Sequence, residues 1–161
     1  MVGEQPGNDE DLAGHPFVGP AGKLLDRALA AAGLDRTRVY VTNAVKHFKW
    51  QARGKRRIHQ KPNASELAAC RPWLDGELAA LRPRIVVCLG ATAAQALLGR
   101  AFRVTRQRGQ LLDAPPGLGA THALATYHPS AVLRAPDDEA RARMMAELVA
   151  DLKVVAERLR S

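Results

Sequence analysis

The densest group of chemically capable side chains lies in the run from Lys46 to Lys61. This run holds seven lysines and arginines and no carboxylate, and Phe48, Trp50 and Ile58 are interleaved with the charges. Positive charges bind phosphate oxygens and aromatic rings stack on unpaired bases, so the composition suits a single strand of nucleic acid. The run also holds His59. Composition alone leaves open whether His59 reacts or is an uninvolved histidine in a solvated basic loop.

Three further polar groups follow segments that the apolar pattern predicts to be strands. Glu4 and Gln5 follow the first such segment, Asn43 follows the second, and His128 follows the last. In a parallel sheet, ligands bind in the crevice outside the carboxyl ends of the strands. We therefore expect these side chains to point into one crevice.

Strands and helices alternate along the sequence. Strands are expected at 1–2, 39–42, 84–89 and 124–127, and helices at 23–33, 63–81, 90–99 and 137–160. The pattern Asn63-Ala64-Ser65-Glu66 is a capping box that opens the second helix. A weaker ribbon is expected at 104–112, and a loop over the basic run, which has neither helical nor strand periodicity. The alternation predicts an α/β fold with a parallel sheet covered by helices on both faces.

The composition limits the class of protein. With 161 residues the chain has the size of one domain, and its formal net charge of +8 favours a polyanionic partner, either nucleic acid or an anionic membrane surface. Cys70 and Cys88 are the only thiols, and neither a secretory signal nor an apolar run long enough to span a bilayer is visible. We expect a reducing intracellular setting, no disulfide framework and no membrane span.

Several short motifs occur in a characteristic order. They are Gly3-Glu4-Gln5-Pro6-Gly7, Glu10-Asp11, Gly14, Pro16-Phe17-Val18-Gly19, Thr42-Asn43 and His128-Pro129-Ser130. Together they resemble the iron–sulfur uracil-DNA glycosylases (family 4) over nearly the whole chain. The segment Lys55-Arg56-Arg57-Ile58-His59 is similar to an extra loop of one branch, the UdgX proteins, which capture uracil-containing DNA covalently through the loop histidine. The resemblance implies one domain over residues 1–161, a three-layer α/β/α sandwich with a short, mainly parallel central sheet.

The resemblance also implies how uracil would be held. Phe17 would stack on the flipped base, and the main chain at Gln5 would line the pocket. Asn43 would donate to uracil O4 and accept from N3–H, a pattern that cytosine reverses. His128 would donate to O2, where negative charge develops as the bond to deoxyribose breaks.

Glu4 and His59 would carry the reaction that distinguishes the UdgX branch. In an ordinary family member a positioned water attacks C1′ of the sugar. Here the neutral imidazole of His59 would attack instead, and Glu4 would accept the other ring N–H. The enzyme would then act once, on single-stranded DNA by preference, because an unpaired base costs less to flip. The residues expected to contact the DNA backbone are Lys55, Arg56, Arg57 and Ser130.

The family's [4Fe–4S] cluster is expected to be incomplete in this chain. The resemblance places two ligands at Cys70 and at His47, where imidazole would replace thiolate as in Rieske centres. Family members carry a Cys-x-x-Cys before the first strand, and no such motif precedes Met1. We expect an N-terminal segment to be missing, so that this chain should not hold a complete cluster by itself. Cys88, within an apolar strand, is expected in the core.

Two other functions fit the sequence. One is an ordinary multiple-turnover family 4 hydrolase whose basic loop only binds phosphates. The other, from a different class, is a non-catalytic module that binds uracil-containing DNA. A dinucleotide-binding fold is disfavoured because no Gly-x-Gly-x-x-Gly follows a strand. We expect a monomer that acts in base excision repair in the bacterial cytoplasm.

Overall fold

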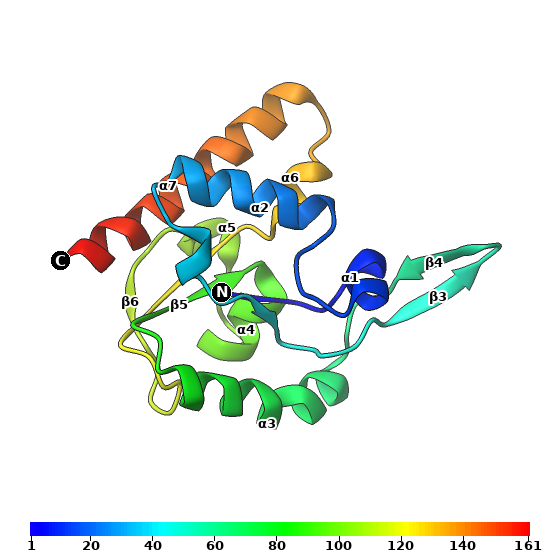
Figure 1. The fold of residues 1–161 in the computed structure, drawn as a ribbon, viewed down its shortest axis with the longest axis horizontal. Helices are drawn as coiled ribbons and strands as arrows, with labels where there is room; N and C mark the ends of the chain where they lie inside the picture. Colours follow the sequence, from blue (N-terminus) through cyan, green and yellow to red (C-terminus); the bar gives the residue numbers. More distant parts are fainter.

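The centre of the molecule is a five-stranded sheet, which the computed structural model describes together with all other residues from 1 to 161 (Figure 1). Its strands are β1 (Val2–Gly3), β2 (Thr42–Asn43), β5 (Ile85–Leu89), β6 (Leu112–Asp113) and β7 (His122–Thr126). They lie in the order β2-β1-β5-β7-β6, and only β6 is antiparallel to its neighbour. The prediction of a short, mainly parallel sheet is confirmed.

Helices cover both faces of this sheet. On one side lie α2 (Pro20–Ala31), α6 (Pro129–Leu133) and α7 (Asp138–Arg160), and on the other α3 (Ala64–Leu81), α4 (Ala91–Leu98) and α5 (Val104–Gln107). β5 serves both layers because successive side chains of a strand point to opposite faces. Val86 and Cys88 pack with the α3 layer, and Val87 and Leu89 with the α7 layer. The three-layer α/β/α architecture is therefore confirmed.

The capping box predicted for α3 forms, and α7 also has a side-chain cap. Asn63 Oδ1 accepts from the Glu66 backbone N–H at 2.9 Å, and Glu66 Oε2 accepts from the Asn63 N–H at 2.8 Å. At the start of α7, the Asp137 side chain accepts from the Ala140 N–H at 2.7 Å. The strand expected at 39–42 begins only at Thr42, because its pairing partner β1 spans only Val2–Gly3; the 3₁₀ turn η1 (Arg36–Arg38) precedes it.

The prediction of a loop over the basic run is wrong for most of its length. Residues 50–59 form a two-stranded antiparallel hairpin, β3 (Trp50–Arg53) and β4 (Arg56–His59), which projects from the body beside α1 (Asn8–Ala13) (Figure 1). Gly54 turns the chain with φ of 61°. Both faces of the hairpin are largely exposed, so its strands lack the apolar alternation by which strands are recognised.

The ribbon expected at 104–112 is also wrong. The segment opens with the short helix α5 and then leads into β6, which pairs with β7. Arg108 turns inward and donates from one guanidinium nitrogen to both oxygens of Asp151 on α7, at 2.8 and 2.9 Å. The buried Asp151 also accepts from Thr126 at 2.6 Å. This polar network fixes the segment to α7 instead of leaving it free to pair with itself.

None of the helices combines the length and the hydropathy needed to cross a lipid bilayer.

Candidate active site

The predicted crevice exists at the carboxyl ends of β1, β2, β5 and β7. It is a cavity of about 610 Å³. The sequence-predicted residues that line it are Glu4, Gln5, Phe17, Asn43, His59, His128 and Ser130. The expectation that separate strand ends point their functional groups into one crevice is confirmed. His59 reaches the same cavity from the end of the hairpin, although its side chain is 52% exposed.

Asn43 supplies the crevice with an unpaired hydrogen-bond acceptor. The residue is buried and its Oδ1 has no partner in the protein. An amide oxygen left unpaired in the interior costs free energy, which a ligand N–H would recover. Gly3 makes this placement possible, since a Cβ there would lie 2.6 Å from Asn43 Oδ1 and 2.7 Å from Phe17 Cζ.

Phe17 lies against the same pocket in a constrained backbone conformation. Its φ is 54°, in the left-handed region that residues with a Cβ seldom adopt. Its carbonyl oxygen lies so close to Gly22, on α2, that a Cβ at Gly22 would overlap it. The phenyl ring stacks on His128 with ring centroids 5.7 Å apart and an interplanar angle of 29°. The pocket therefore has an aromatic wall beside a histidine.

The tautomer of His128 follows from its contacts. Its Nδ1 accepts from the Ser130 backbone N–H at 3.1 Å and lies 2.7 Å from Ser130 Oγ, so the ring proton resides on Nε2. Burial lowers the pKa of His128 to about 4, an effect that the nearby Glu4 opposes and Arg134 and His59 reinforce. The imidazole is therefore neutral at pH 7 and available as an N–H donor. His128 caps α6 through this contact, and the expected phosphate contact of Ser130 stays a prediction.

Glu4 joins the hairpin to the body of the protein. Glu4 Oε1 lies 3.0 Å from His59 Nε2, and Glu4 Oε2 accepts from the Thr92 hydroxyl at 2.5 Å. When Nε2 of His59 carries its proton toward Glu4, the other ring nitrogen keeps its lone pair. Thr92 was not among the residues predicted from the sequence. The one signal was its place at the strand-to-helix turn after β5, a fourth strand end at the same edge of the sheet.

The side chain of Gln5 fixes the base of the hairpin. Its Nε2 donates to the carbonyls of Lys49 and Gln60, at 3.3 and 3.0 Å, and its Oε1 accepts from the Lys49 N–H at 3.2 Å. Gln5 follows Glu4 in the chain and Gln60 follows His59. The side-chain amide of Gln5 thus holds the neighbours of the carboxylate and the imidazole together, and so sets the spacing of that pair.

The basic residues of the hairpin divide into two kinds. Lys55 and Arg56 are exposed at the turn, as a DNA contact requires. Arg57 is instead engaged within the protein: it donates to Asn8 at 2.8 Å and to Asp11 at 2.7 Å on α1. Its guanidinium also lies 5.2 Å from the centroid of the Phe48 ring and 5.5 Å from that of Trp50. Arg57 therefore fastens β4 to the body.

His47 and Cys70 lie together, as their predicted ligand roles require. The distance from Cys70 Sγ to His47 Nδ1 is 3.9 Å, and the thiol also accepts from the Lys46 N–H at 3.4 Å. No third cysteine, histidine, aspartate or glutamate joins them. A [4Fe–4S] cluster takes four ligands, so these two residues do not by themselves fit it, and no step of the chemistry is derived through it. Cys88 is fully buried in the core, as expected, and burial raises its pKa to about 12.

Comparisons with known proteins agree on one family. Residues 1–153 match the family described as the uracil DNA glycosylase superfamily. The chain is 37% identical over 161 residues to the type-4 uracil-DNA glycosylase of Archaeoglobus fulgidus, a match that covers 98% of this chain and 74% of that protein. It is 39% identical over 140 residues to the type-4 enzyme of Pyrobaculum aerophilum, covering 84% and 68%. It is 36% identical over 149 residues to that of Thermotoga maritima, covering 92% and 72%.

Proposed function

The chain belongs to the uracil-DNA glycosylase superfamily, and on this premise we propose that it excises uracil from DNA and is then captured on the abasic sugar through His59. The excision itself is the activity named for its relatives. The observation that carries the capture step is the 3.0 Å contact between His59 Nε2 and Glu4 Oε1, within the cavity that Asn43 and His128 also line.

Excision requires a pocket that prefers uracil and stabilises its anion. The unpaired Oδ1 of Asn43 suits the N3–H of uracil, which cytosine lacks, so cytosine would leave that oxygen unpaired. Phe17 offers its ring face to the base. The Nε2–H of neutral His128 serves as a donor to O2 while the electrons of the N1–C1′ bond pass to the leaving pyrimidine.

Capture replaces the attack of water by the attack of imidazole. The ring nitrogen of His59 that Glu4 does not hold forms a bond to C1′ with its lone pair, and the N1–C1′ bond breaks. The positive charge left on the imidazole is offset by the Glu4 carboxylate, which is in position to accept the remaining ring proton. An N-alkyl imidazole that has lost this proton is a poor leaving group, so the adduct persists and the enzyme acts once.

The hairpin supplies the surface along which DNA would lie. Lys55 and Arg56 are free to pair with phosphates, and the half-exposed ring of Trp50 offers a stacking face. This arrangement follows a single strand more readily than a stiff duplex, and flipping an unpaired base costs less. Single-stranded DNA is the proposed preferred substrate, and a monomeric state in the bacterial cytoplasm stays a prediction.

A second function is favoured by the type-4 names of the relatives. In that alternative a water held at the carboxylates attacks C1′, and the hairpin only binds phosphates. Glu4 and Glu10 both border the cavity and are capable of holding such a water. The two functions differ in one measurable respect, because hydrolysis releases the enzyme and capture does not.

A denaturing gel separates these functions. The protein is incubated with a labelled single-stranded oligonucleotide that contains one uracil, then heated in detergent. Capture predicts a slow band that survives denaturation and at most one product per enzyme molecule. Free abasic product in excess of enzyme means hydrolysis, and unchanged oligonucleotide means binding only.

Two histidine variants assign the nucleophile. His59→Ser should abolish the slow band and, by admitting water at C1′, allow multiple turnover. His15→Ser is the matched control, since His15 is exposed outside the cavity, and it should cross-link as the parent does. A slow band that persists in His59→Ser would show that another group is the nucleophile.

A further inference from the structure

A cluster of charged side chains lies beside the end of β7, next to the segment that leads to His128. Its centre is Arg108, whose guanidinium pairs with two carboxylates of α7. Nη2 lies 3.1 Å from Glu147 Oε1, and Nη1 donates to both oxygens of Asp151, at 2.8 and 2.9 Å. Glu147 and Asp151 are four residues apart, so they lie on one face of the helix, one turn apart. A single arginine therefore binds both carboxylates.

Each of these carboxylates also binds one of the two residues that precede His128. Asp151 Oδ2 accepts from the Thr126 hydroxyl at 2.6 Å. Glu147 Oε2 accepts from the Tyr127 hydroxyl at 2.8 Å, and the guanidinium lies 5.0 Å from the centroid of the Tyr127 ring. Tyr127 and His128 both line the cavity of about 610 Å³. The cluster thus holds two consecutive side chains immediately before the proposed donor to uracil O2.

The cluster is built into the interior and is joined to β7 through the main chain as well. Asp151 is only 5% exposed, and a buried carboxylate is tolerated only when charged or polar donors surround it. Arg108 and Thr126 supply those donors. The next residue, Gly109, has φ of 74°, and a Cβ there would overlap Asp151 Oδ1. Its N–H donates to the Ala125 carbonyl of β7 at 2.9 Å, so the cluster and the end of β7 move together.

We infer that Arg108 is a positioning residue for uracil excision, which through the two carboxylates holds the end of β7 so that His128 aims its Nε2–H at uracil O2. The inference rests on the proposed function. The contacts of the His128 ring with Ser130 and Phe17 set the rotation of the ring, whereas the cluster sets where the main chain enters the cavity. A displacement of about 1 Å in such a site costs about 100-fold in rate.

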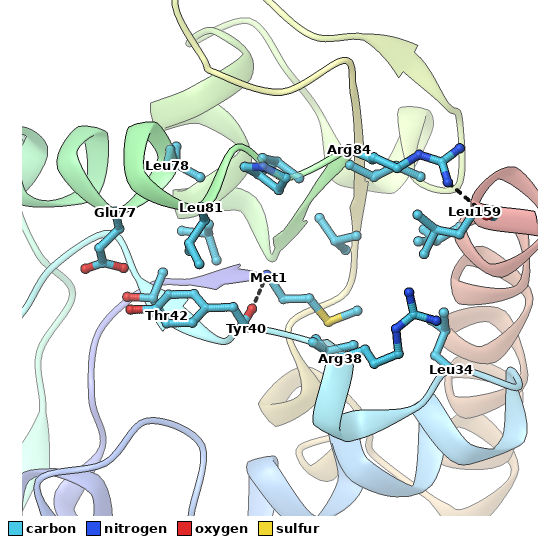
Figure 2. A pocket seen from close by; sticks show the side chains of 17 residues that line it. Met1, Leu34, Arg38, Tyr40, Thr42, Glu77, Leu78, Leu81, Arg84 and Leu159 are labelled. Atoms are coloured by element: carbon cyan, nitrogen blue, oxygen red, sulfur yellow. Dashed lines mark hydrogen bonds between the residues drawn. The ribbon is translucent and has the colours of Figure 1, made fainter.

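A second arginine makes a comparable link between the sheet and α7, at the amino end of the sheet. Arg84, just before β5, donates to the Leu159 carbonyl at 2.9 Å and to the Arg158 carbonyl at 3.3 Å (Figure 2). It borders a second cavity, of about 270 Å³, whose walls are mostly apolar. Arg84 therefore supports α7 as Arg108 does, but at the end of the sheet away from His128, and its variant is the matched control.

The variants Arg108→Gln and Arg84→Gln test the inference. Excision of uracil from a labelled single-stranded oligonucleotide is followed in single turnover, and urea midpoints report stability. Both variants should lose stability. Arg108→Gln should also lower the maximal rate per folded molecule by about tenfold or more, with the half-saturating oligonucleotide concentration changed less than about twofold. Arg84→Gln should keep the parent rate. A parent-like maximal rate in folded Arg108→Gln would overturn the inference.

Variants of Glu147 give a second test that does not disturb the interior, because this side chain is 33% exposed. Glu147→Ala removes the acceptor of the Tyr127 hydroxyl and should slow excision about fivefold. Glu147→Gln keeps a carbonyl oxygen for that hydroxyl and should recover most of the rate. A Glu147→Ala protein as fast as the parent would overturn the inference, and so would a Glu147→Gln protein no faster than Glu147→Ala.

Nuclear magnetic resonance of the protein without DNA separates this inference from the proposed function. The resonances of the His128 ring should shift in Arg108→Gln and in Glu147→Ala but not in Arg84→Gln, whether or not the protein excises uracil. A parent protein that leaves the oligonucleotide intact would overturn the proposed function and leave this readout in place. Unchanged His128 resonances in Arg108→Gln would overturn the positioning role of Arg108.

Discussion

The two ends of the central sheet hold cavities of opposite character. At the carboxyl end, polar groups from several strands converge on about 610 Å³, with an unpaired amide oxygen at Asn43 and a neutral imidazole at His128. At the amino end, about 270 Å³ is lined chiefly by aliphatic side chains and by an unpaired strand edge. The first holds polar groups that can bind and react with a ligand, and the second offers chiefly apolar walls. The groups that a cavity leaves unpaired, more than its size, indicate what it binds.

The same contrast appears along β7. His122 begins this strand and lies near Arg158, whose Nε donates to it at 3.2 Å, whereas His128 follows the strand at the other end. The largest predicted effect on the rate of uracil excision distinguishes His128 from His122. His128→Ala should slow uracil excision by about 10²–10³-fold, the usual cost of one donor to a developing anion. His122→Ala should leave single-turnover excision within about twofold. The excision rates are measured with a labelled oligonucleotide. Equal losses of rate in the two variants would contradict the assignment of the reaction to the carboxyl end of the sheet.

The cavity at the carboxyl end should also make the stability of the protein depend on pH, through His128. Below pH 6.5 the unfolded chain protonates His128, but the folded protein resists until about pH 4, so stability is present above 6.5 and falls as the pH drops toward 4. The total loss is at most about 3 kcal/mol.

Urea midpoints measured across pH check this window. His128→Asn should flatten the acidic slope. An acidic slope that is unchanged in His128→Asn would mean that other groups cause it.

A substitution at the amino-end cavity should affect stability and leave the chemistry intact. Leu78 is buried between α3 and the sheet and borders an existing cavity, so Leu78→Ala should cost about 2 kcal/mol, the low end for such truncations. Urea unfolding measures the cost. The excision rate per folded molecule should be unchanged, and a tenfold fall in that rate would show that the two ends are coupled.

The smallest effect should arise at Thr92, whose hydroxyl donates to Glu4. Thr92→Val leaves one carboxylate oxygen without this partner, so adduct formation should slow about tenfold, equivalent to about 1.4 kcal/mol, and its pH profile should shift. Thr92→Ser keeps the hydroxyl and should restore both. A Ser variant that is as slow as the Val variant would assign Thr92 a packing role instead of a positioning role.

Much of the fold could be predicted because its elements follow from burial and capping. Ile85–Leu89 is continuously apolar because helices cover both faces of the strand, and Asn63 and Glu66 have the spacing of a capping box. The hairpin was not predicted because neither of its faces is buried against the core. Its sequence therefore lacks the alternation of apolar and polar residues by which strands are recognised. The helix α1 escaped for a similar reason, since none of its residues is buried.

The site was predictable where strand ends carry polar side chains. Glu4, Asn43 and His128 follow from the rule that parallel strands gather their carboxyl ends. Thr92 was missed because one threonine after a glycine turn is common in sequences, and only the structure brings it to Glu4. The role of Gln5 in holding the hairpin depends on Gln60, which lies far away in the sequence.

The hairpin is attached to the body at its base, and this determines which parts of it can be changed without moving Glu4 and His59. The Gln5 side chain binds both ends of the hairpin, at Lys49 and Gln60. The turn at Gly54 and Lys55 therefore lies outside the contacts that position Glu4 and His59. Insertions or reporter groups at that turn should be tolerated. Replacing the whole hairpin should likewise change the groups that face the cavity without altering the sheet beneath it.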